Sequence, residues 1–366
     1  MIVRIQGNTE LKNGIYYEYD SASIPLGKGG MGTVYQGFCI NAENPSEFVP
    51  VAIKAIHHPT KDLIDRAMRE ASIQIDHPNL LRMYGLIPNM EKDEYTKEYQ
   101  LKYYLVMERI VGVSLEKLME GVLIDTSGTF IDFAKELYEQ YVSDRSAFVK
   151  RIVSAVGQGL EALHNMGYVH RDVDPSNVMV TEDGKIKLID YGVSKAIQVY
   201  NGPKLTQAGA LIGKIDYAAP EIISGDVNNH NKTTDIYALG IMIYKMYIGA
   251  LPFLGDNTQV MHAQMNTPIP ANNISDPVIR SVVQKAAAKV QADRYQDVGS
   301  LVADIRKEVA PKPVRIKTEK VKEKKGPKEK KVVVERPSIE VKSWMWACAA
   351  AGGIIIGLAA SLLSSL

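Results

Sequence analysis

Two short polar runs in the middle of the chain carry the residue types that phosphoryl transfer requires. The first run, at 170–177, holds the carboxylate of Asp172 and, five residues later, the amide of Asn177. The second holds the carboxylate of Asp190, thirteen residues after Asn177. Transfer of a phosphoryl group from ATP needs a carboxylate that orients the acceptor hydroxyl and oxygen ligands for magnesium. The two runs offer both kinds of group.

A glycine-rich run at 27–34 could hold the phosphates. It fits the pattern G-x-G-x-x-G-x-V, and glycines let the backbone approach phosphates and present N–H groups to them. A dinucleotide-binding fold would need a helix directly after the glycines, whereas a strand-like run at 33–38 follows here. Lys54 ends the next apolar run, where a lysine is usually a surface residue. Glu70, from the following helix, could instead hold Lys54 over the phosphates.

In this order and at these spacings, the motifs resemble those of the eukaryotic-like (Hanks-type) protein kinase family. The resemblance covers residues 20–309 and includes Ala219-Pro220-Glu221. It implies that Arg294 pairs with Glu221 and that Asp235 is the buried aspartate that anchors the catalytic loop. It also implies an α+β, bilobal protein-kinase fold.

The resemblance assigns roles to the residues of both runs. By it, Asp172 is the catalytic base, and Lys54 pairs with Glu70 and contacts the phosphates of ATP. Asn177 and Asp190 would hold Mg²⁺. The residues implied to bind the nucleotide are Leu26, Gly27, Lys28, Gly29, Gly30, Met31, Gly32, Val34, Ala52, Lys54, Met107, Glu108, Ile110 and Met179. ATP and Mg²⁺ are therefore the implied cofactors. Serine and threonine hydroxyls of protein substrates, the kinase itself included, are the implied acceptors, and no nucleic-acid partner is implied.

Two positions depart from the family pattern together. Asp174 stands where serine/threonine kinases carry a lysine that touches the γ-phosphate, and Lys214 replaces a threonine that contacts that lysine. We expect a charge swap, in which Lys214 either pairs with Asp174 or reaches the γ-phosphate itself. Opposite unit charges about 4 Å apart attract by roughly 4 kcal/mol at an effective dielectric constant near 20, before desolvation. Both residues therefore join the candidate catalytic set, with coincidence as the alternative.

Two other functions remain open at this point. The changes at Asp174 and Lys214 would also suit a pseudokinase scaffold that binds ATP without catalysis, against which the retained Lys54 and Asp172 argue. A small-molecule kinase of related fold is the second alternative. The segment between Gly192 and Pro220, called the activation segment below, is long, and its length favours a protein acceptor.

Arg171 adds a cation beside the carboxylate of Asp172. In kinases of this pattern such an arginine usually binds a phosphate in the activation segment. The hydroxyls available there belong to Ser194, Tyr200, Thr206 and Tyr217. Thr206 is the favoured acceptor, and neutralisation of Arg171 by acidic side chains, or by nothing, is the alternative.

The patterns along the chain suggest two lobes. Residues 15–110 read as a β-rich N-lobe with one helical stretch at 61–75, and a polar stretch at 89–103 looks like an insertion between two strands. Residues 111–310 read as an α-helical C-lobe, because apolar residues recur there at helical spacing. The expected helices of the C-lobe lie at 148–166, 235–247, 276–289 and 297–309.

The last part of the chain has the composition of a membrane attachment. Residues 311–342 contain twelve Lys or Arg and five Asp or Glu, which predicts a basic, disordered juxtamembrane linker. Residues 343–364 contain no charged side chain, and roughly 20 apolar residues can span a bilayer. We expect a single-pass C-terminal transmembrane helix with the kinase domain in the cytoplasm, since lysines precede the span. A buried C-terminal helix is the alternative.

Two further expectations concern partners. Small residues recur every fourth position from Ala349 to Ser365, which is typical of a helix-packing face and favours a homodimer through the span. The linker could be attracted to anionic lipid, or could be only a solvated connection. The two cysteines, Cys39 and Cys348, lie far apart, so a reducing compartment without a disulfide framework is expected.

Overall fold

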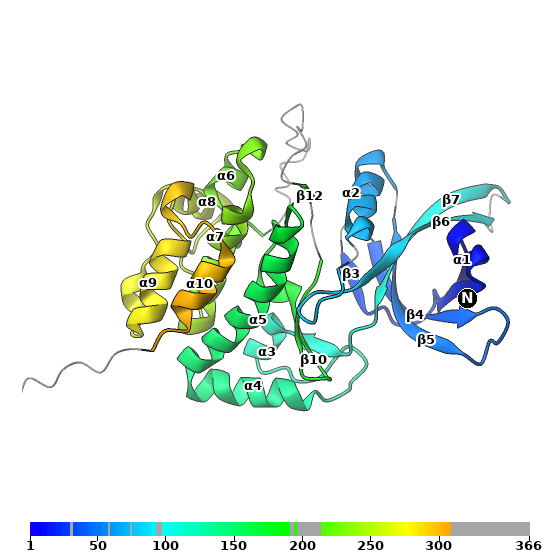
Figure 1. The fold of residues 1–366 in the computed structure, drawn as a ribbon, viewed down its shortest axis with the longest axis horizontal. Coiled ribbons are helices and arrows are strands. Elements are labelled where there is room, and N and C mark those ends of the chain that lie inside the picture. Colours follow the sequence, from blue (N-terminus) through cyan, green and yellow to red (C-terminus); the bar gives the residue numbers. More distant parts are fainter. Residues whose placement is uncertain are drawn as a thin grey trace, which may run out of the picture. The chain divides into compact units, whose positions relative to one another are not determined.

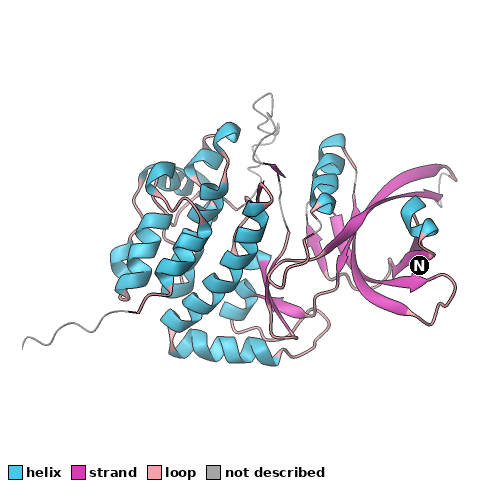
Figure 2. Cartoon of the chain, in the orientation of Figure 1, coloured by secondary structure: helices cyan, strands magenta, loops and turns pink. Residues whose placement is uncertain are grey.

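A computed structural model describes residues 1–308 of the 366, except 30–31, 58, 74, 93–96, 191–193 and 196–213; of 194–195 and 227 only the backbone is described. Residues 196–213 of the activation segment and everything after residue 308 therefore lie outside the described residues. Residues 1–310 form one compact unit. Within it, Figures 1 and 2 show a strand-rich lobe and a helical lobe, as the resemblance implies.

The N-lobe is built on one antiparallel sheet. Its strands run in the order β1-β2-β4-β5-β7-β6, and β3 pairs with β4. Their bounds are β1 (Ile2–Ile5), β2 (Ile15–Asp20), β3 (Gly27–Gly29), β4 (Gly32–Asn41), β5 (Phe48–Ile56), β6 (Met83–Lys92) and β7 (Tyr99–Glu108). The sheet begins earlier than the predicted N-lobe boundary at residue 15, because β1 pairs with β2 and is followed by helix α1 (Asn8–Lys12).

Alternation along the strands assigns each side chain to one face of the sheet. On β5, Val51 and Ile53 join a small cluster that includes Tyr104 and lies within the N-lobe. Ala52, between them, belongs instead to the large core that continues into the helices of the C-lobe. Lys54 follows Ala52 by two positions, so the same alternation places it on the face toward the C-lobe.

The predicted polar insertion at 89–103 is wrong for most of its length. Residues 89–92 belong to β6 and 99–103 to β7, and the two strands are paired from Met83 to Lys92. Glu91 receives hydrogen bonds across the ladder from Lys102 and Tyr104. The hairpin extends beyond the core, so its strands carry polar side chains, which in the sequence look like a loop.

The C-lobe is mainly helical, and the four predicted helices are confirmed with shifted ends. They are α5 (Arg145–Asn165), α7 (Lys232–Ile248), α9 (Pro277–Ala286) and α10 (Val298–Ile305). The N-lobe helix α2 (Lys61–Ser72) is also confirmed, and its last residue is Ser72 rather than residue 75. Helices not foreseen are α3 (Leu115–Met119), α4 (Asp132–Ser143), α6 (Pro220–Ile223) and α8 (Asn257–Asn266). Helix α4 buries Ala134, Leu137 and Tyr141, a helical spacing that the sequence already contains.

Short strands and turns of the C-lobe carry the polar runs described above. Three strands form a small sheet in the order β11-β10-β8, and β9 pairs with β12. Their bounds are β8 (Gly112–Ser114), β9 (Tyr168–Val169), β10 (Val178–Thr181), β11 (Ile186–Leu188) and β12 (Ser194–Lys195). The 3-10 turns η1 (Pro175–Asn177) and η2 (Ile215–Tyr217) follow Asp174 and Lys214 directly. Both departures from the family pattern therefore stand at the start of a turn.

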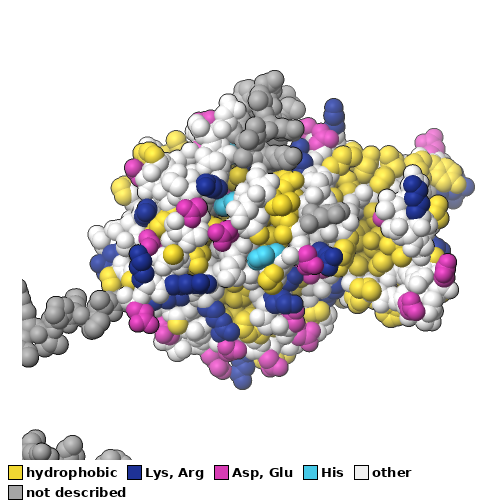
Figure 3. Space-filling model, viewed as in Figure 1, with side chains coloured by type: hydrophobic (Ala, Val, Ile, Leu, Met, Phe, Trp, Pro, Cys, Tyr) yellow, Lys and Arg dark blue, Asp and Glu magenta, His cyan; other side chains and the backbone are white. Residues whose placement is uncertain are grey.

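The surface differs between the two lobes. On the face drawn in Figure 3, hydrophobic side chains gather over the strand-rich lobe, whereas acidic and basic side chains alternate over the helical lobe. Met68, Met90 and Leu101 are among the exposed hydrophobic residues of the N-lobe. Among the residues that the structure describes, no helix is long and apolar enough to cross a bilayer. The segment predicted to do so, 343–364, is not among them.

Candidate active site

The ammonium group of Lys54 lies against the carboxylate of Asp190. Lys54 Nζ is 3.4 Å from Asp190 Oδ1, and the lysine side chain is buried while that of Asp190 is half exposed. Asp190 has a φ of 55°, a left-handed conformation that is uncommon outside glycine. Such conformations cost about 1–3 kcal/mol and concentrate at functional sites. The backbone is therefore held so that the Asp190 carboxylate meets a cation from β5.

The predicted ion pair between Lys54 and Glu70 is not formed, although both side chains belong to the described part of the chain. Glu70 is 3% exposed, and its Oε1 lies 3.2 Å from Arg66 Nε, one turn earlier on α2. Burial raises the pKa of Glu70, and the charges of Lys54 and Arg66 lower it by less. Lys54 is thus near enough to lower the pKa of Glu70. In the structure, however, Lys54 is paired with Asp190 and Glu70 with Arg66. The Lys54–Glu70 pair is part of the active arrangement of protein kinases.

Asn177 ties together the carboxylates of the first polar run. Its Nδ2 donates to the backbone oxygen of Asp172 at 2.8 Å, to Asp172 Oδ2 at 3.0 Å and to Asp174 Oδ2 at 3.3 Å. The backbone oxygen of Asn177 also accepts from the N–H of Ile189, the residue before Asp190. The two polar runs are therefore joined at this point, and the carboxylate of Asp172 is oriented by a neighbouring amide.

The carboxylate of Asp235 holds the start of the same loop. It is fully buried and accepts hydrogen bonds from the backbone N–H of His170 at 2.8 Å and of Arg171 at 2.7 Å. His164 Nε2 lies 2.8 Å from the same carboxylate. Burial acts to raise the pKa of Asp235, but these contacts keep it below the ordinary value. Arg171, with a φ of 68°, is thereby fixed in a strained turn immediately before Asp172.

The donor set present fits a magnesium ion. Hard divalent cations take oxygen ligands, and Asp190 supplies an exposed carboxylate. Because the nitrogen of the Asn177 amide is used by Asp172, its oxygen is the end left for a ligand. Burial and the neighbouring charge of Asp174 raise the pKa of Asp172, and binding of a cation nearby would favour the ionised form of that carboxylate.

The residues expected around the nucleotide base and phosphates lie on adjacent strands. Ala52 on β5 faces Met107 on β7, and Val34 on β4 faces Lys54. The backbone N–H of Leu26 donates to the oxygen of Val34 at 2.8 Å. Leu26, Val34 and Ile110 pack against the large core, and Met179 lies on β10 of the C-lobe sheet. These side chains come from both lobes, as an adenine site between the lobes requires.

The glycine-rich run forms the β3–β4 turn, with Gly27 opposite Val34 in the ladder. A Cβ on Gly32 would lie 2.1 Å from the backbone oxygen of Ala55, so no larger residue fits there without movement. A Cβ on Gly27 or Gly29 would meet nothing within 4 Å, and Lys28 between them is exposed. Gly30 and Met31 lie outside the described residues. The side chain of Glu108, another of the residues expected to bind the nucleotide, forms an ion pair with the buried Lys187.

Lys214 lies beside Asp174, so the first of the two predicted arrangements is the one present. Lys214 Nζ is 3.2 Å from Asp174 Oδ1, which also accepts from the backbone N–H of Ser176 at 2.7 Å and from its hydroxyl at 2.6 Å. Burial acts to lower the pKa of Lys214, but the carboxylates of Asp174 and Glu116 raise it by more. The lysine is therefore held as a cation against the catalytic run.

Arg171 lines a small pocket together with Lys214 and Tyr217 at the end of the activation segment. Its Nε is buried and has no hydrogen-bond partner within the described ranges. Burial lowers the pKa of Arg171, and the positive charge of Arg69 on α2 adds to this effect. Tyr200 and Thr206 lie outside the described residues, as does the side chain of Ser194. Tyr217 is buried, which leaves its hydroxyl unsuited to accept a phosphate in this state.

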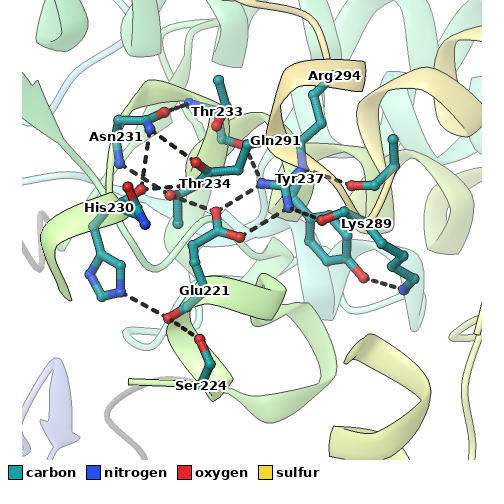
Figure 4. A network of polar contacts seen from close by, with 12 residues as sticks. Glu221, Ser224, His230, Asn231, Thr233, Thr234, Tyr237, Lys289, Gln291 and Arg294 are labelled. Atoms are coloured by element: carbon teal, nitrogen blue, oxygen red, sulfur yellow. Dashed lines mark hydrogen bonds and ion pairs between the residues drawn. The ribbon is translucent and has the colours of Figure 1, made fainter. Parts of the chain in front are cut away.

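The end of the activation segment is fixed by a buried ion pair (Figure 4). Arg294 donates from both terminal nitrogens to the carboxylate of Glu221, at 2.8 and 3.0 Å. The hydroxyl of Thr234 donates to the same carboxylate at 2.8 Å, and Arg294 also reaches the backbone oxygen of Thr233. The pairing that the resemblance implies for Glu221 and Arg294 is thus present, and it joins α6 to α7 and the turn before α10.

Several residues of the site were not foreseen. They are Arg66, Arg69, Glu116, Ser176, Lys187 and Lys245. Only the pairing of Arg66 with Glu70 leaves a signal in the sequence, because residues four apart face each other on a helix. Ser176 contacts Asp174 within the same run, and the others meet across elements that are distant in the chain.

Comparison with known proteins agrees with this geometry. The model of the protein kinase domain matches residues 21–335, so the chain belongs to the protein kinase domain family. It is 27% identical over 292 residues to a probable serine/threonine-protein kinase PknB of Lactococcus lactis, covering 76% of this chain and 40% of that protein. It is 29% identical over 291 residues to the serine/threonine-protein kinase PrkC of Bacillus subtilis, covering 77% and 39%. The chain thus spans about two fifths of the length of these curated relatives.

A solved structure shares the fold. The kinase domain of PknI from Mycobacterium tuberculosis superimposes with a TM-score of 0.50 at 20% sequence identity, covering 77% of this chain and 92% of that one. At this identity the likeness shows the bilobal fold alone.

Proposed function

We propose that the protein is an ATP- and Mg²⁺-dependent serine/threonine protein kinase. The observation that carries the proposal is the convergence of the two polar runs with β5. Lys54 pairs with Asp190, Ile189 is hydrogen-bonded to Asn177, and Asn177 donates to Asp172. Phosphoryl transfer uses a cation, oxygen ligands for a metal ion and an oriented carboxylate. Lys54, the pair Asn177 and Asp190, and Asp172 are the candidates for these three tasks.

Each residue has a separate task in this proposal. Asp172 accepts a hydrogen bond from the acceptor hydroxyl and orients it toward the γ-phosphate. Asn177 keeps the Asp172 carboxylate in place through its amide nitrogen. Lys54 offsets negative charge on the α- and β-phosphates, and Asp190 and Asn177 would hold Mg²⁺. When bound, the metal ion stabilises charge on the phosphates.

The test is phosphorylation by the purified protein supplied with ATP and Mg²⁺, with the acceptor residues mapped by mass spectrometry. We expect phosphoserine and phosphothreonine on the protein itself and on added protein substrates. Phosphate found only on tyrosine would contradict the acceptor class. ATP binding without any transfer would favour the pseudokinase scaffold, and transfer to small molecules alone would favour the small-molecule kinase.

We further propose the arrangement of the whole chain. The kinase domain would include β1 and extend through residue 310. Residues 311–342 would form a basic linker with affinity for anionic lipid, and 343–364 a transmembrane anchor that can pair two copies. The support is the composition of these segments, which have the charge of a basic linker and the apolarity of a membrane span.

Flotation with membranes tests the anchor. The full chain is expected to float with membranes of the expressing cells after a high-salt wash, and a chain ending at residue 342 is not. Equal flotation of both, or of neither, would contradict the anchor. Crosslinking of the full chain, compared with a variant carrying Gly353→Leu and Gly357→Leu, tests pairing through the span.

A further inference from the structure

Asp174 places a second acid beside the carboxylate of Asp172. It is 1% exposed, and a single amide nitrogen, that of Asn177, donates to both carboxylates. Like charges that are buried next to each other repel. A burial of two acids side by side therefore needs a compensating cation.

Among the residues that the structure describes, Lys214 provides this cation, with its Nζ 3.2 Å from Asp174 Oδ1. Its Nζ also lies 3.1 Å from the hydroxyl of Ser176 and 3.4 Å from Glu116 Oε1 on α3. Glu116 in turn lies 3.7 Å from Lys245 Nζ on α7. Asp174, Lys214, Glu116 and Lys245 therefore form a row of charges that alternate in sign and sum to zero. The row connects the loop at 170–177 with α3 and α7.

The backbone that carries Lys214 is fixed independently of this row. The turn η2 begins directly after Lys214, and the side chain of the buried Gln264 on α8 donates to backbone oxygens of Ile215 and Asp216. Lys214 thus reaches the catalytic loop from a segment that is held by α8. Asp172 and Lys214 line one small pocket, together with Tyr217.

We propose that Lys214 is a positioning residue for phosphoryl transfer. Its ion pair with Asp174 joins the end of the activation segment to the catalytic loop, and so fixes Asp172 for the acceptor hydroxyl. The inference rests on the proposed kinase activity. In the family, a lysine at the position of Asp174 contacts a threonine at the position of Lys214. In this chain the lysine stands at the second position instead, and Lys214 also lies 3.4 Å from Glu116.

Charge reversal in the full chain tests the proposal. Asp174→Lys and Lys214→Asp are each expected to lower kcat for a protein substrate by about tenfold to hundredfold, since small misplacements of reacting groups have effects of this size. KM for ATP should change little, because neither side chain is proposed to bind the nucleotide. The double reversal restores the ion pair and should recover most of the lost kcat. Losses that multiply in the double variant would overturn the proposal.

Three controls keep the result interpretable. Asp183 and Lys185 form an exposed ion pair of the same residue types on the β10–β11 turn, and its reversal should leave kcat unchanged. Lys214→Arg should retain most activity, and thermal unfolding shows whether each variant folds. If the double reversal does not fold, the double variant Asp174→Lys with Lys214→Thr is measured in its place. It too should recover most of the kcat that Asp174→Lys loses.

The two proposals fail in different ways. An unmodified chain without kinase activity refutes the proposed function, whatever the variants do. An active unmodified chain whose single variants keep full kcat, or whose double variant recovers nothing, refutes only the role of Lys214.

Discussion

At the scale of single residues, Arg66 competes with Lys54 for the carboxylate of Glu70. In the structure Glu70 is paired with Arg66, one turn earlier on α2, and Lys54 with Asp190. The active arrangement of the family has Lys54 paired with Glu70 instead. In the present structure, Lys54 is therefore not paired with α2.

Removal of Arg66 should release Glu70 to Lys54. We expect Arg66→Gln to raise the basal phosphorylation rate several-fold, because the nearly buried Glu70 then has Lys54 as its remaining basic neighbour. Glu70→Gln should lower the rate by tenfold or more, on the order of the effect of losing one catalytic contact. Initial rates at saturating ATP measure both. Equal rates for Arg66→Gln and the unmodified chain would show that the two basic residues do not compete.

The buried ion pair of Arg294 and Glu221 gives a prediction for stability. Arg294→Met leaves the Glu221 carboxylate buried without its partner, and breaking such a pair costs about 3–5 kcal/mol. Lys307→Met removes an exposed pair with Asp304, which is worth roughly 0–1 kcal/mol. Urea unfolding monitored by circular dichroism compares the two. Similar losses in both variants would contradict the structural role of Arg294.

At the scale of elements, the glycines of the β3–β4 turn are not equivalent. A Cβ on Gly32 would lie 2.1 Å from the Ala55 oxygen, whereas one on Gly29 would meet nothing within 4 Å. Gly32→Ala should therefore push β4 from β5 and destabilise the fold by about 1–3 kcal/mol, as overpacking does. Gly29→Ala should leave stability nearly unchanged. Thermal unfolding decides, and a larger loss for Gly29→Ala would contradict the placement of these strands.

The sequence was informative about elements where one periodicity dominates. The four C-lobe helices and α2 could be predicted because each repeats apolar residues at helical spacing over several turns. The β6–β7 hairpin could not, because Glu91 and Lys102 stabilise it by pairing across the strands, and cross-strand pairs leave no local pattern. Composition alone made this hairpin look like an insertion.

The same distinction applies to the site. The positions of Lys54, Asp172, Asn177 and Asp190 near one another follow from motif spacing and family resemblance. The sequence allows Glu70 to pair with either Arg66 or Lys54, and only the folded chain shows that Glu70 is paired with Arg66. For Asp174 and Lys214, opposite charges were visible in the sequence, but the contributions of Glu116 and Ser176 appear only once the chain is folded.

At the scale of the whole molecule, buried carboxylates make stability depend on pH. Burial acts to raise the pKa of Glu221, but Arg294 lowers it by more, so it lies below the ordinary value of 4.5. A carboxylate with a lower pKa in the folded state stabilises the protein above the unfolded pKa, and this contribution is lost as pH falls through the folded pKa. Asp235 acts in the same direction, below its ordinary value of 3.8.

The free energy of unfolding should therefore decrease as pH drops below 4.5. Glu221→Gln cannot lose a proton, so its unfolding free energy should fall less steeply over the same range. Urea titrations at a series of pH values between about 7 and 3 measure the slopes, at constant salt. A steeper acid loss in Glu221→Gln than in the unmodified chain would contradict a lowered pKa for Glu221.

In the proposed function, one set of side chains from both lobes supports phosphoryl transfer, with Asp172 as the base. The most direct test compares the full chain with Asp172→Asn, measuring ATP affinity by calorimetry and phosphate transfer to a protein substrate by initial rate. We predict unchanged ATP affinity and a rate lowered by about 10²–10⁴-fold, the usual contribution of general base catalysis. Transfer by Asp172→Asn at the rate of the unmodified chain would contradict the claim.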